Sequence, residues 1–189
     1  MNKIKVNLLH VTPEIVVIKA VSKPYATEKA NRELVKKVGL IYKHQSVLEH
    51  ITMNFEILGI SRLCLQELVR HRIASYTVES TRFTLQKLDI EKHFSEYFVI
   101  PHELKDNNAY KNYCEKRLHS LYYNQNKNDV KKYFLPENFR TNLIMSINLR
   151  AFLNFLELRE ASGAHFEIKH LANLMRTEIE STYIGELIK

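Results

Sequence analysis

Glycine is scarce in this chain: only four of the 189 residues are glycine, and only four are proline. These residues are scattered, so no Gly/Ser-rich linker divides the sequence, and it holds no repeat or low-complexity tract. One domain over residues 1–189 is therefore expected, with a length that suits a single core. Neither the glycine-rich dinucleotide fingerprint nor the P-loop pattern occurs, so a nucleotide would have to be held by side chains and helix ends.

The apolar pattern changes along the chain between the strand and the helix period. Residues 51, 53, 55 and 57 (Ile, Met, Phe, Ile) alternate onto one face, which predicts a strand that ends at Gly59. A second strand is expected over 3–11. Helices are expected over 27–42 with Thr27 as cap, from Ser61 as cap to about His71, and over 106–124, 150–160 and 165–183. Residues 142–148 fit either period. This mixture predicts an α+β fold.

The net charge and the composition limit the classes of binding partner but do not identify one. The formal net charge of +7 favours anionic partners such as nucleic acid, phosphorylated metabolites or an anionic membrane, although the surplus lysines could simply solubilise the surface. No apolar run is long enough for a membrane-spanning helix, and the N-terminus lacks a signal-peptide core, so a cytoplasmic protein is expected. Two cysteines are too few for a disulfide framework and fit a reducing compartment.

The segment from Glu67 to Arg82 carries the densest set of functional side chains, including Arg70, His71, Arg72 and Ser80. If it were helical, Arg70 and Arg72 would point to opposite sides, and each would need its own anion. The guanidinium fork suits phosphate. The alternative is a surface cluster, because Glu67 stands at helical spacing from Arg70 and His71.

A second segment runs from Asn148 to Arg159. On a helix, Arg150 and Asn154 share one polar face, whereas Arg159 projects close to Phe152 into the apolar arc. A guanidinium there needs an anion or another acceptor. The alternative is that Arg159 binds the last carbonyls of its own helix.

Two further patterns argue against other chemistries. His44 and His50 resemble a metal motif only superficially, because their spacing is poor for one helical face, and no metal is predicted. Cys64 lies among leucines in a predicted helix and Cys114 stands before Glu115, so neither is expected to be a nucleophile. A Ser80–His71 hydrolase lacks an oxyanion motif and an orienting acid.

Together, these segments resemble the flavin-dependent thymidylate synthase family. Its hallmark is Arg-His-Arg, seven residues and then Ser, and here Arg70-His71-Arg72 precedes Ser80 with that gap. The segments His44–His50 and Asn148–Arg159 stand in the family's order on either side. The resemblance implies an α+β fold with a mostly antiparallel sheet flanked by helices. It also implies reductive methylation of dUMP to dTMP, with methylenetetrahydrofolate as carbon donor and NADPH as reductant through FAD.

The resemblance also assigns roles to residues. The cofactor FAD would contact Ser46, Arg70, His71, Arg72, Asn148, Arg150 and Asn154, with His44 near the flavin. The substrate dUMP would contact Gln66, Glu67, Arg70, Glu79, Ser80, Thr81, Arg82, Lys132 and Arg159. Arg159 matches the catalytic arginine that polarises the uracil ring at N3. A homotetramer with sites shared between subunits is implied, with no nucleic-acid or membrane partner.

Three positions depart from the family pattern, and one of them is His165, which stands where a glutamine is common. Val78 stands where an acidic residue is usual, with Glu79 one place later, and Lys132 stands where an arginine often binds phosphate. A lysine supplies a point charge without a bidentate grip. The competing function is a basic nucleic-acid-binding module, but interspersed Glu and Asp residues break up any basic stripe.

Overall fold

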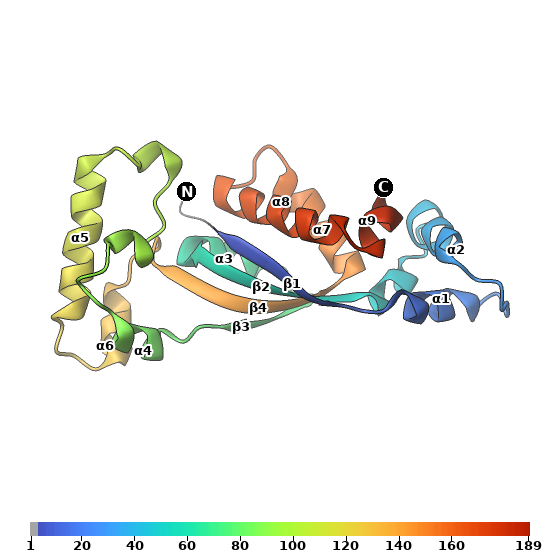
Figure 1. Ribbon diagram of the computed structural model, residues 1–189, viewed down its shortest axis with the longest axis horizontal. Coiled ribbons are helices and arrows are strands. Elements are labelled where there is room, and N and C mark those ends of the chain that lie inside the picture. The colour runs from blue at the N-terminus through green and yellow to red at the C-terminus, as the bar shows by residue number, and fades with distance from the viewer. Residues whose placement is uncertain (1–3) are drawn as a thin grey trace. The chain divides into compact units, whose positions relative to one another are not determined.

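In the computed structural model the described residues, 4–189, form an α+β fold, as predicted (Figure 1). Their strands make a four-stranded sheet in the order β1-β2-β4-β3. The strands are β1 Lys5–Val11, β2 Thr52–Ser61, β3 Ala74–Val78 and β4 Arg140–Asn148. The first strand was expected from Lys3, which lies outside the described residues. The ambiguous segment 142–148 belongs to β4.

The backbone hydrogen bonds between β2 and β4 show an antiparallel register. Arg62 N, just after β2, donates to Phe139 O at 3.0 Å, and Leu149 N donates to Ile51 O at 2.8 Å, so residue numbers rise on one strand as they fall on the other. The predicted antiparallel sheet is confirmed. Ile51 and the alternating β2 residues Met53, Phe55 and Ile57 are fully buried, which confirms the predicted strand face.

Both ends of the segment from Gly59 to His71 differ from the prediction. The strand β2 does not end at Gly59 but passes through it to Ser61, because glycine tolerates the φ of 79° found there. The Ser61 Oγ accepts a hydrogen bond from Cys64 N at 2.9 Å, which confirms the predicted cap. The following helix, α3 Arg62–Leu68, ends three residues earlier than expected.

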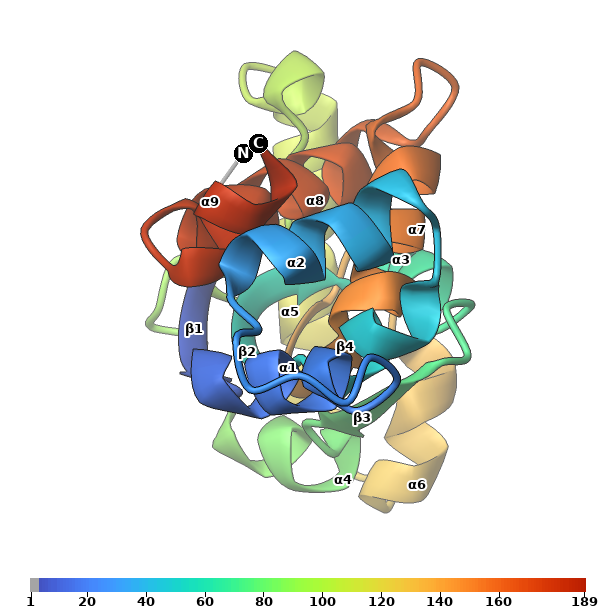
Figure 2. The same cartoon turned by 90° about the vertical axis from the view of Figure 1, so that its right-hand side faces the viewer.

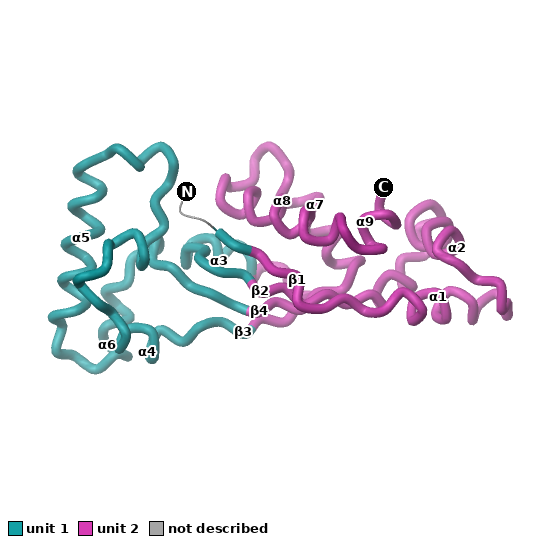
Figure 3. The backbone as a smooth tube through the Cα atoms, in the orientation of Figure 1, with its two compact units in different colours: residues 1–5, 57–68, 77–143 teal, residues 6–56, 69–76, 144–189 magenta. Residues whose placement is uncertain are grey.

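The chain forms two compact units, which Figure 3 colours separately. The first comprises residues 1–5, 57–68 and 77–143, and the second 6–56, 69–76 and 144–189. The prediction of one domain remains a prediction.

The first unit has its own apolar core. Helix α5 Asn108–Tyr122, predicted as 106–124, contributes Cys114, Leu118 and Leu121, which cluster with Phe98. The other helices of this unit are α3, α4 Thr81–Thr84 and α6 Asn128–Lys131, with short 3-10 turns η3 Leu85–Lys87, η4 Phe94–Glu96, η5 His102–Leu104 and η6 Lys132–Phe134.

The second unit places two long helices on one face of its strands (Figure 1). Helix α7 Leu149–Glu160 buries Phe152, whose ring stacks on Phe55 of β2 at a centroid distance of 5.6 Å. Helix α8 Phe166–Glu180 packs against α7, and α9 Tyr183–Ile188 follows it. The helix predicted over 165–183 is therefore α8, which ends three residues earlier, at Glu180.

The N-terminal part of this unit was predicted least well. Helix α1 Glu14–Ser22 was not predicted, and it contacts α2 Arg32–Lys36 (Figure 2). The N-cap of α2 is Asn31, whose Oδ1 accepts from Leu34 N at 3.0 Å, so Thr27 is not its cap. It widens into the π-helical turn η1 Lys37–Ile41 before η2 Gln45–His50. No described helix has an apolar stretch long enough to cross a bilayer.

Candidate functional site

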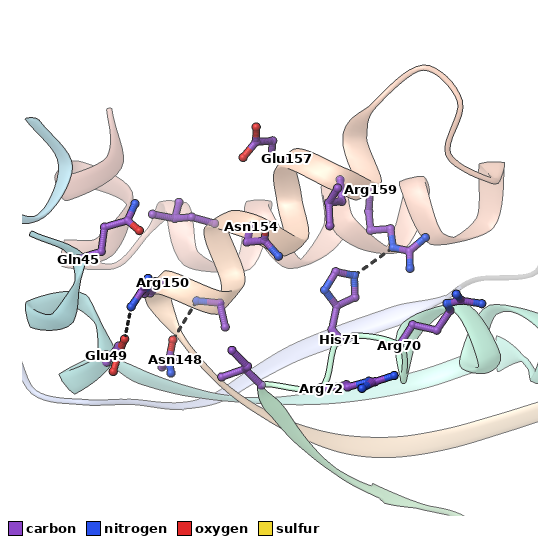
Figure 4. Close-up of a pocket in the computed structure, with 14 residues that line it drawn as sticks. Gln45, Glu49, Arg70, His71, Arg72, Asn148, Arg150, Asn154, Glu157 and Arg159 are labelled. Atoms are coloured by element: carbon purple, nitrogen blue, oxygen red, sulfur yellow. Dashed lines mark hydrogen bonds and ion pairs between the residues drawn. The ribbon is translucent and has the colours of Figure 1, made fainter. Parts of the chain in front are cut away.

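A cavity of about 820 Å³ lies within the second unit (Figure 4). Its walls come from η2, from the loop between α3 and β3, and from one side of α7. The lining residues are Gln45, Glu49, Arg70, His71, Arg72, Ile73, Asn148, Arg150, Ala151, Leu153, Asn154, Glu157, Leu158 and Arg159. Six of the residues that were predicted to bind FAD therefore meet in one cavity, together with Arg159.

The wall formed by α7 begins at its capped N-terminus. Asn148 is the N-cap, and its Oδ1 accepts from Ala151 N at 2.9 Å. Capping uses only the oxygen, so the amide NH₂ group of Asn148 remains a donor for a ligand. Arg150 and Asn154 line the cavity from one face of the helix, as predicted. The Arg150 guanidinium donates to Glu49 Oε1 of η2 at 2.6 Å.

The opposite wall is a loop where a helix was expected. Because α3 ends at Leu68, Arg70 and Arg72 lie in the irregular segment before β3. The prediction that they face opposite sides of a helix is therefore wrong, since a loop is not bound by helical spacing. Both arginines line the same cavity, and both lie next to His71 (Figure 4).

Arg159 has an uncharged acceptor as a partner. Its Nε donates to His71 Nε2 at 3.1 Å, across the cavity from α7 to the loop (Figure 4). The edge of the His71 ring meets Phe155 at a centroid distance of 4.9 Å. The Arg159 side chain thus has the acceptor that its place beside the apolar arc requires.

Burial, with a smaller contribution from the Arg159 charge, shifts the pKa values of His71 and Tyr76. Burial lowers the pKa of His71, and the neighbouring charge of Arg159 lowers it further. Burial raises the pKa of Tyr76 to about 12, and the Tyr76 hydroxyl donates to the His71 carbonyl oxygen at 2.7 Å. At neutral pH the His71 imidazole is therefore neutral, as an acceptor for Arg159 Nε must be.

The charge of the cavity favours an anionic ligand. Arg70, Arg72, Arg150 and Arg159 face it against the two carboxylates Glu49 and Glu157, which leaves an excess of two positive charges. The first turn of α7 adds the positive end of its helix dipole.

Most residues predicted to contact dUMP belong to the first unit, where one carboxylate joins two of them. Asp129 accepts two hydrogen bonds from Arg82 and pairs with Lys132. Ser80 is the N-cap residue of α4, and Thr81 is its first residue. Gln66 donates to Glu137 Oε2 at 2.8 Å, and Glu67 lies on α3.

Glu79 lies in another place. It lines a second cavity, of about 420 Å³, together with Lys5, Lys87 and Arg140, and not with Arg159. The Glu79 backbone N–H donates to Asn142 O at 2.9 Å. Its predicted contact with dUMP therefore remains a prediction.

Three polar residues that line the cavity were given no role from the sequence. Gln45 and Glu49 flank Ser46 and were passed over with the rejected metal motif, while the exposed Ser46 and His44 do not line the cavity. Glu157 was identifiable, because it follows Arg150 and Asn154 at helical spacing. Within residues 4–189, no three His, Cys, Asp or Glu side chains gather as a metal site would require.

Comparison with known proteins agrees with this geometry. The family model described as thymidylate synthase complementing protein matches residues 7–183. The flavin-dependent thymidylate synthase of Wolinella succinogenes is 41% identical over 152 residues, covering 77% of this chain and 74% of the relative. That of Helicobacter pylori (strain 26695) is 40% identical over 156 residues, covering 77% and 75%. A crystal structure of the H. pylori enzyme with FAD and dUMP matches with a TM-score of 0.84 and 35% identity, covering 93% of each chain.

Proposed function

The chain belongs to the flavin-dependent thymidylate synthase family, and we propose that its cavity in the second unit holds FAD and that Arg159 activates dUMP there. The observation that carries this proposal is the convergence of Arg70, His71 and Arg72 with the face of α7 around one cationic cavity. We further propose methylenetetrahydrofolate as the carbon donor and NADPH as the reductant, in the de novo synthesis of dTMP. A cytoplasmic location remains a prediction from the sequence.

The residues around the cavity fit an anionic dinucleotide without a glycine-rich loop. Arginines from two elements and the N-terminus of α7 supply the positive charge that phosphates require. Arg70, His71, Arg72, Asn148, Arg150 and Asn154 would hold FAD, with further contacts from Ser46 and His44, which do not line the cavity. Bound FAD supplies the hydride chemistry, while the protein supplies placement and charge.

Arg159 is the residue that we assign to substrate activation. Uracil becomes more nucleophilic at C5 when negative charge on its ring is stabilised, and a fixed guanidinium provides that stabilisation. Two features of Arg159 fit this role. It is partly buried beside the apolar side of α7, and its Nε donates to a neutral acceptor, His71.

The phosphate of dUMP requires separate cations. Arg82 and Lys132 suit it because both contact the carboxylate of Asp129 and therefore lie close together. The backbone N–H groups at the start of α4, near Ser80 and Thr81, offer further donors. Gln66, Glu67, Glu79 and Arg70 complete the proposed dUMP contacts.

We propose that the chain assembles into a homotetramer whose sites combine residues from different subunits. The apolar side chains beside the proposed phosphate cations support an interface there: Tyr133 is 89% exposed and Phe83 is 62% exposed, in direct sequence with Lys132 and Arg82. Large exposed aromatic side chains of this kind are typical of surfaces that bind a partner.

The decisive experiment measures FAD binding and dTMP formation together. Purified protein with added FAD should show flavin bands and should convert dUMP to dTMP only when both methylenetetrahydrofolate and NADPH are present. Arg72→Ala should weaken FAD binding, whereas Arg117→Ala, on α5 of the first unit, should not. Failure to bind FAD at micromolar concentration would contradict the assignment of the cavity.

A further inference from the structure

His71 makes three contacts that leave its imidazole little freedom. Its Nε2 accepts from Arg159 Nε at 3.1 Å, its ring edge meets Phe155 at 4.9 Å, and its backbone carbonyl accepts from the Tyr76 hydroxyl at 2.7 Å. These contacts come from α7 and from β3, so both the ring and the backbone of this loop residue are anchored. A side chain that only gripped an anion from a loop would not need such anchoring.

The hydrogen bond between His71 and Arg159 also fixes the orientation of the Arg159 guanidinium. A guanidinium is planar, and a hydrogen bond at Nε sets the plane in which its two terminal NH₂ groups lie. Uracil offers its ring nitrogen and adjacent carbonyl oxygens in one plane. Fixing the guanidinium before the substrate arrives reduces the reorganisation needed in the reaction.

We propose that His71 is a positioning residue for the thymidylate synthase reaction, which orients the Arg159 guanidinium toward the uracil ring by accepting a hydrogen bond at Nε2. The proposal rests on the role of Arg159 that is set out above. It gives His71 a second role beside contact with FAD, and it makes the neutral Nδ1–H tautomer the active form.

The surroundings of His71 favour that form. Arg159 on α7 faces Nε2, Arg70 and Arg72 flank His71 in its own loop, and Tyr76 reaches its carbonyl from β3. Glu49 and Glu157 are the carboxylates that line the same cavity. Burial and the Arg159 charge lower the pKa of His71. As the pH falls through this lowered pKa, Nε2 gains a proton and can no longer accept from Arg159.

The first test compares two substitutions with opposite expectations. His71→Leu removes the acceptor, while His71→Gln keeps an amide oxygen close to the position of Nε2. With FAD saturating and flavin content verified, His71→Leu should lower kcat for dTMP formation by about 100-fold, the usual result of a misplaced catalytic group. The rate of NADPH oxidation should fall less than kcat for dTMP formation, although His71 is also proposed to contact FAD. His71→Gln should restore most of the loss, and the exposed His102→Gln is the matched control.

The pH profile provides a readout that a purely structural role would not change. In the wild type, kcat/KM for dUMP should decrease at acidic pH as His71 becomes protonated. This acidic limb of the pH profile should be absent in His71→Gln. Glu157→Gln should keep the limb, which separates the imidazole from the nearby carboxylate. Persistence of the limb in His71→Gln would overturn the proposal.

A double-variant cycle separates failure of this inference from failure of the assigned role of Arg159. If His71 acts through Arg159, His71→Leu should cost little more in an Arg159→Ala background. Full activity of Arg159→Ala would refute the role of Arg159 itself. Suppose that Arg159→Ala loses much of its activity and that adding His71→Leu causes an equally large further loss. This result would refute the positioning role of His71 and leave the role of Arg159 standing. The affinity for dUMP, measured by titration calorimetry, gives the same comparison without turnover. It should fall in both His71→Leu and Arg159→Ala.

Discussion

Asp129 accepts two hydrogen bonds from Arg82, one from Nε at 3.1 Å and one from Nη2 at 2.6 Å. The Nζ of Lys132 lies 3.2 Å from Oδ1 of the same carboxylate. One carboxylate therefore neutralises half of the positive charge that we propose for the phosphate of dUMP. The two cations lower the pKa of Asp129, chiefly through the hydrogen bond from Arg82. Asp129 is thus charged at neutral pH and competes with a phosphate for the same donors.

Asp129→Asn is accordingly expected to bind dUMP a few-fold more tightly and to show a steeper loss of affinity with salt. The excess positive charge at Arg82 and Lys132 increases, and interactions of exposed charges are screened by salt. Titration calorimetry at two ionic strengths measures both effects. Asp106→Asn, at another exposed site of the first unit, is the control. Weaker binding of dUMP by Asp129→Asn would show that Asp129 orders the cations and does not compete with the ligand.

Asn148 combines a cap with a place in the cavity, so two substitutions should separate these roles. Asn148→Ala removes the cap of α7 and should lower the free energy of unfolding by about 1 kcal/mol, together with FAD affinity. Asn148→Asp keeps the cap but adds a negative charge to the cavity, so it should keep its stability and lose FAD affinity. Urea denaturation and FAD titration give the two values. Equal FAD affinity in Asn148→Asp and the wild type would remove Asn148 from the cofactor site.

The sequence predicted the parts of the site whose chemistry does not depend on local backbone. The hallmark Arg70-His71-Arg72 and the α7 face of Arg150 and Asn154 could be identified because residue type and helical period specify them. The direction of Arg70 and Arg72 was predicted wrongly, because tertiary structure ends α3 at Leu68 although the apolar pattern continues.

Other features have no signal in a single sequence. The hydrogen bond between His71 and Arg159 joins residues 88 positions apart, and the pair of Arg82 and Asp129 joins residues 47 apart. Such contacts depend on how the elements pack and not on local pattern. The helix α1 Glu14–Ser22 was missed for another reason. Apolar residues such as Ile15 and Val16 also occupy its exposed positions, so the buried pair Val17 and Val21 does not stand out as a helical period.

The two cysteines should be dispensable for catalysis. Both are buried, and burial raises the pKa of Cys114, so its thiolate form is disfavoured at neutral pH. The native enzyme should therefore react slowly with thiol reagents, and a Cys64→Ala, Cys114→Ala variant should retain dTMP formation with some loss of stability from the smaller side chains. Denatured protein serves as the control for full labelling. A folded, FAD-loaded double variant that makes no dTMP would mean that the enzyme uses thiol chemistry.

Arg159→Lys should test whether charge alone is enough at this position. Lysine keeps the positive charge but lacks the planar fork and the Nε–H that donates to His71. We expect kcat for dTMP formation to fall by roughly two orders of magnitude, close to Arg159→Ala, with NADPH oxidation largely retained. Rapid-reaction measurements of flavin reduction and quenched assays of dTMP separate the two half-reactions. An equal loss in both would assign Arg159 a structural role instead.

Mixing inactive variants tests whether subunits share their sites. Arg82 belongs to the first unit and Arg159 to the second, and we propose that both act on one dUMP molecule. If a site combines the first unit of one subunit with the second unit of another, mixed tetramers of Arg82→Ala and Arg159→Ala will contain some sites with both arginines. Partial recovery of dTMP formation is then expected after the two proteins are unfolded and refolded together.

Mixing Arg159→Ala with His71→Leu is the matched control, because both residues line one cavity of the same unit and cannot complement each other. Recovery in the first mixture but not in the second would establish shared sites, whereas a monomer in sedimentation, or no recovery in either mixture, would mean that each chain carries its own complete site.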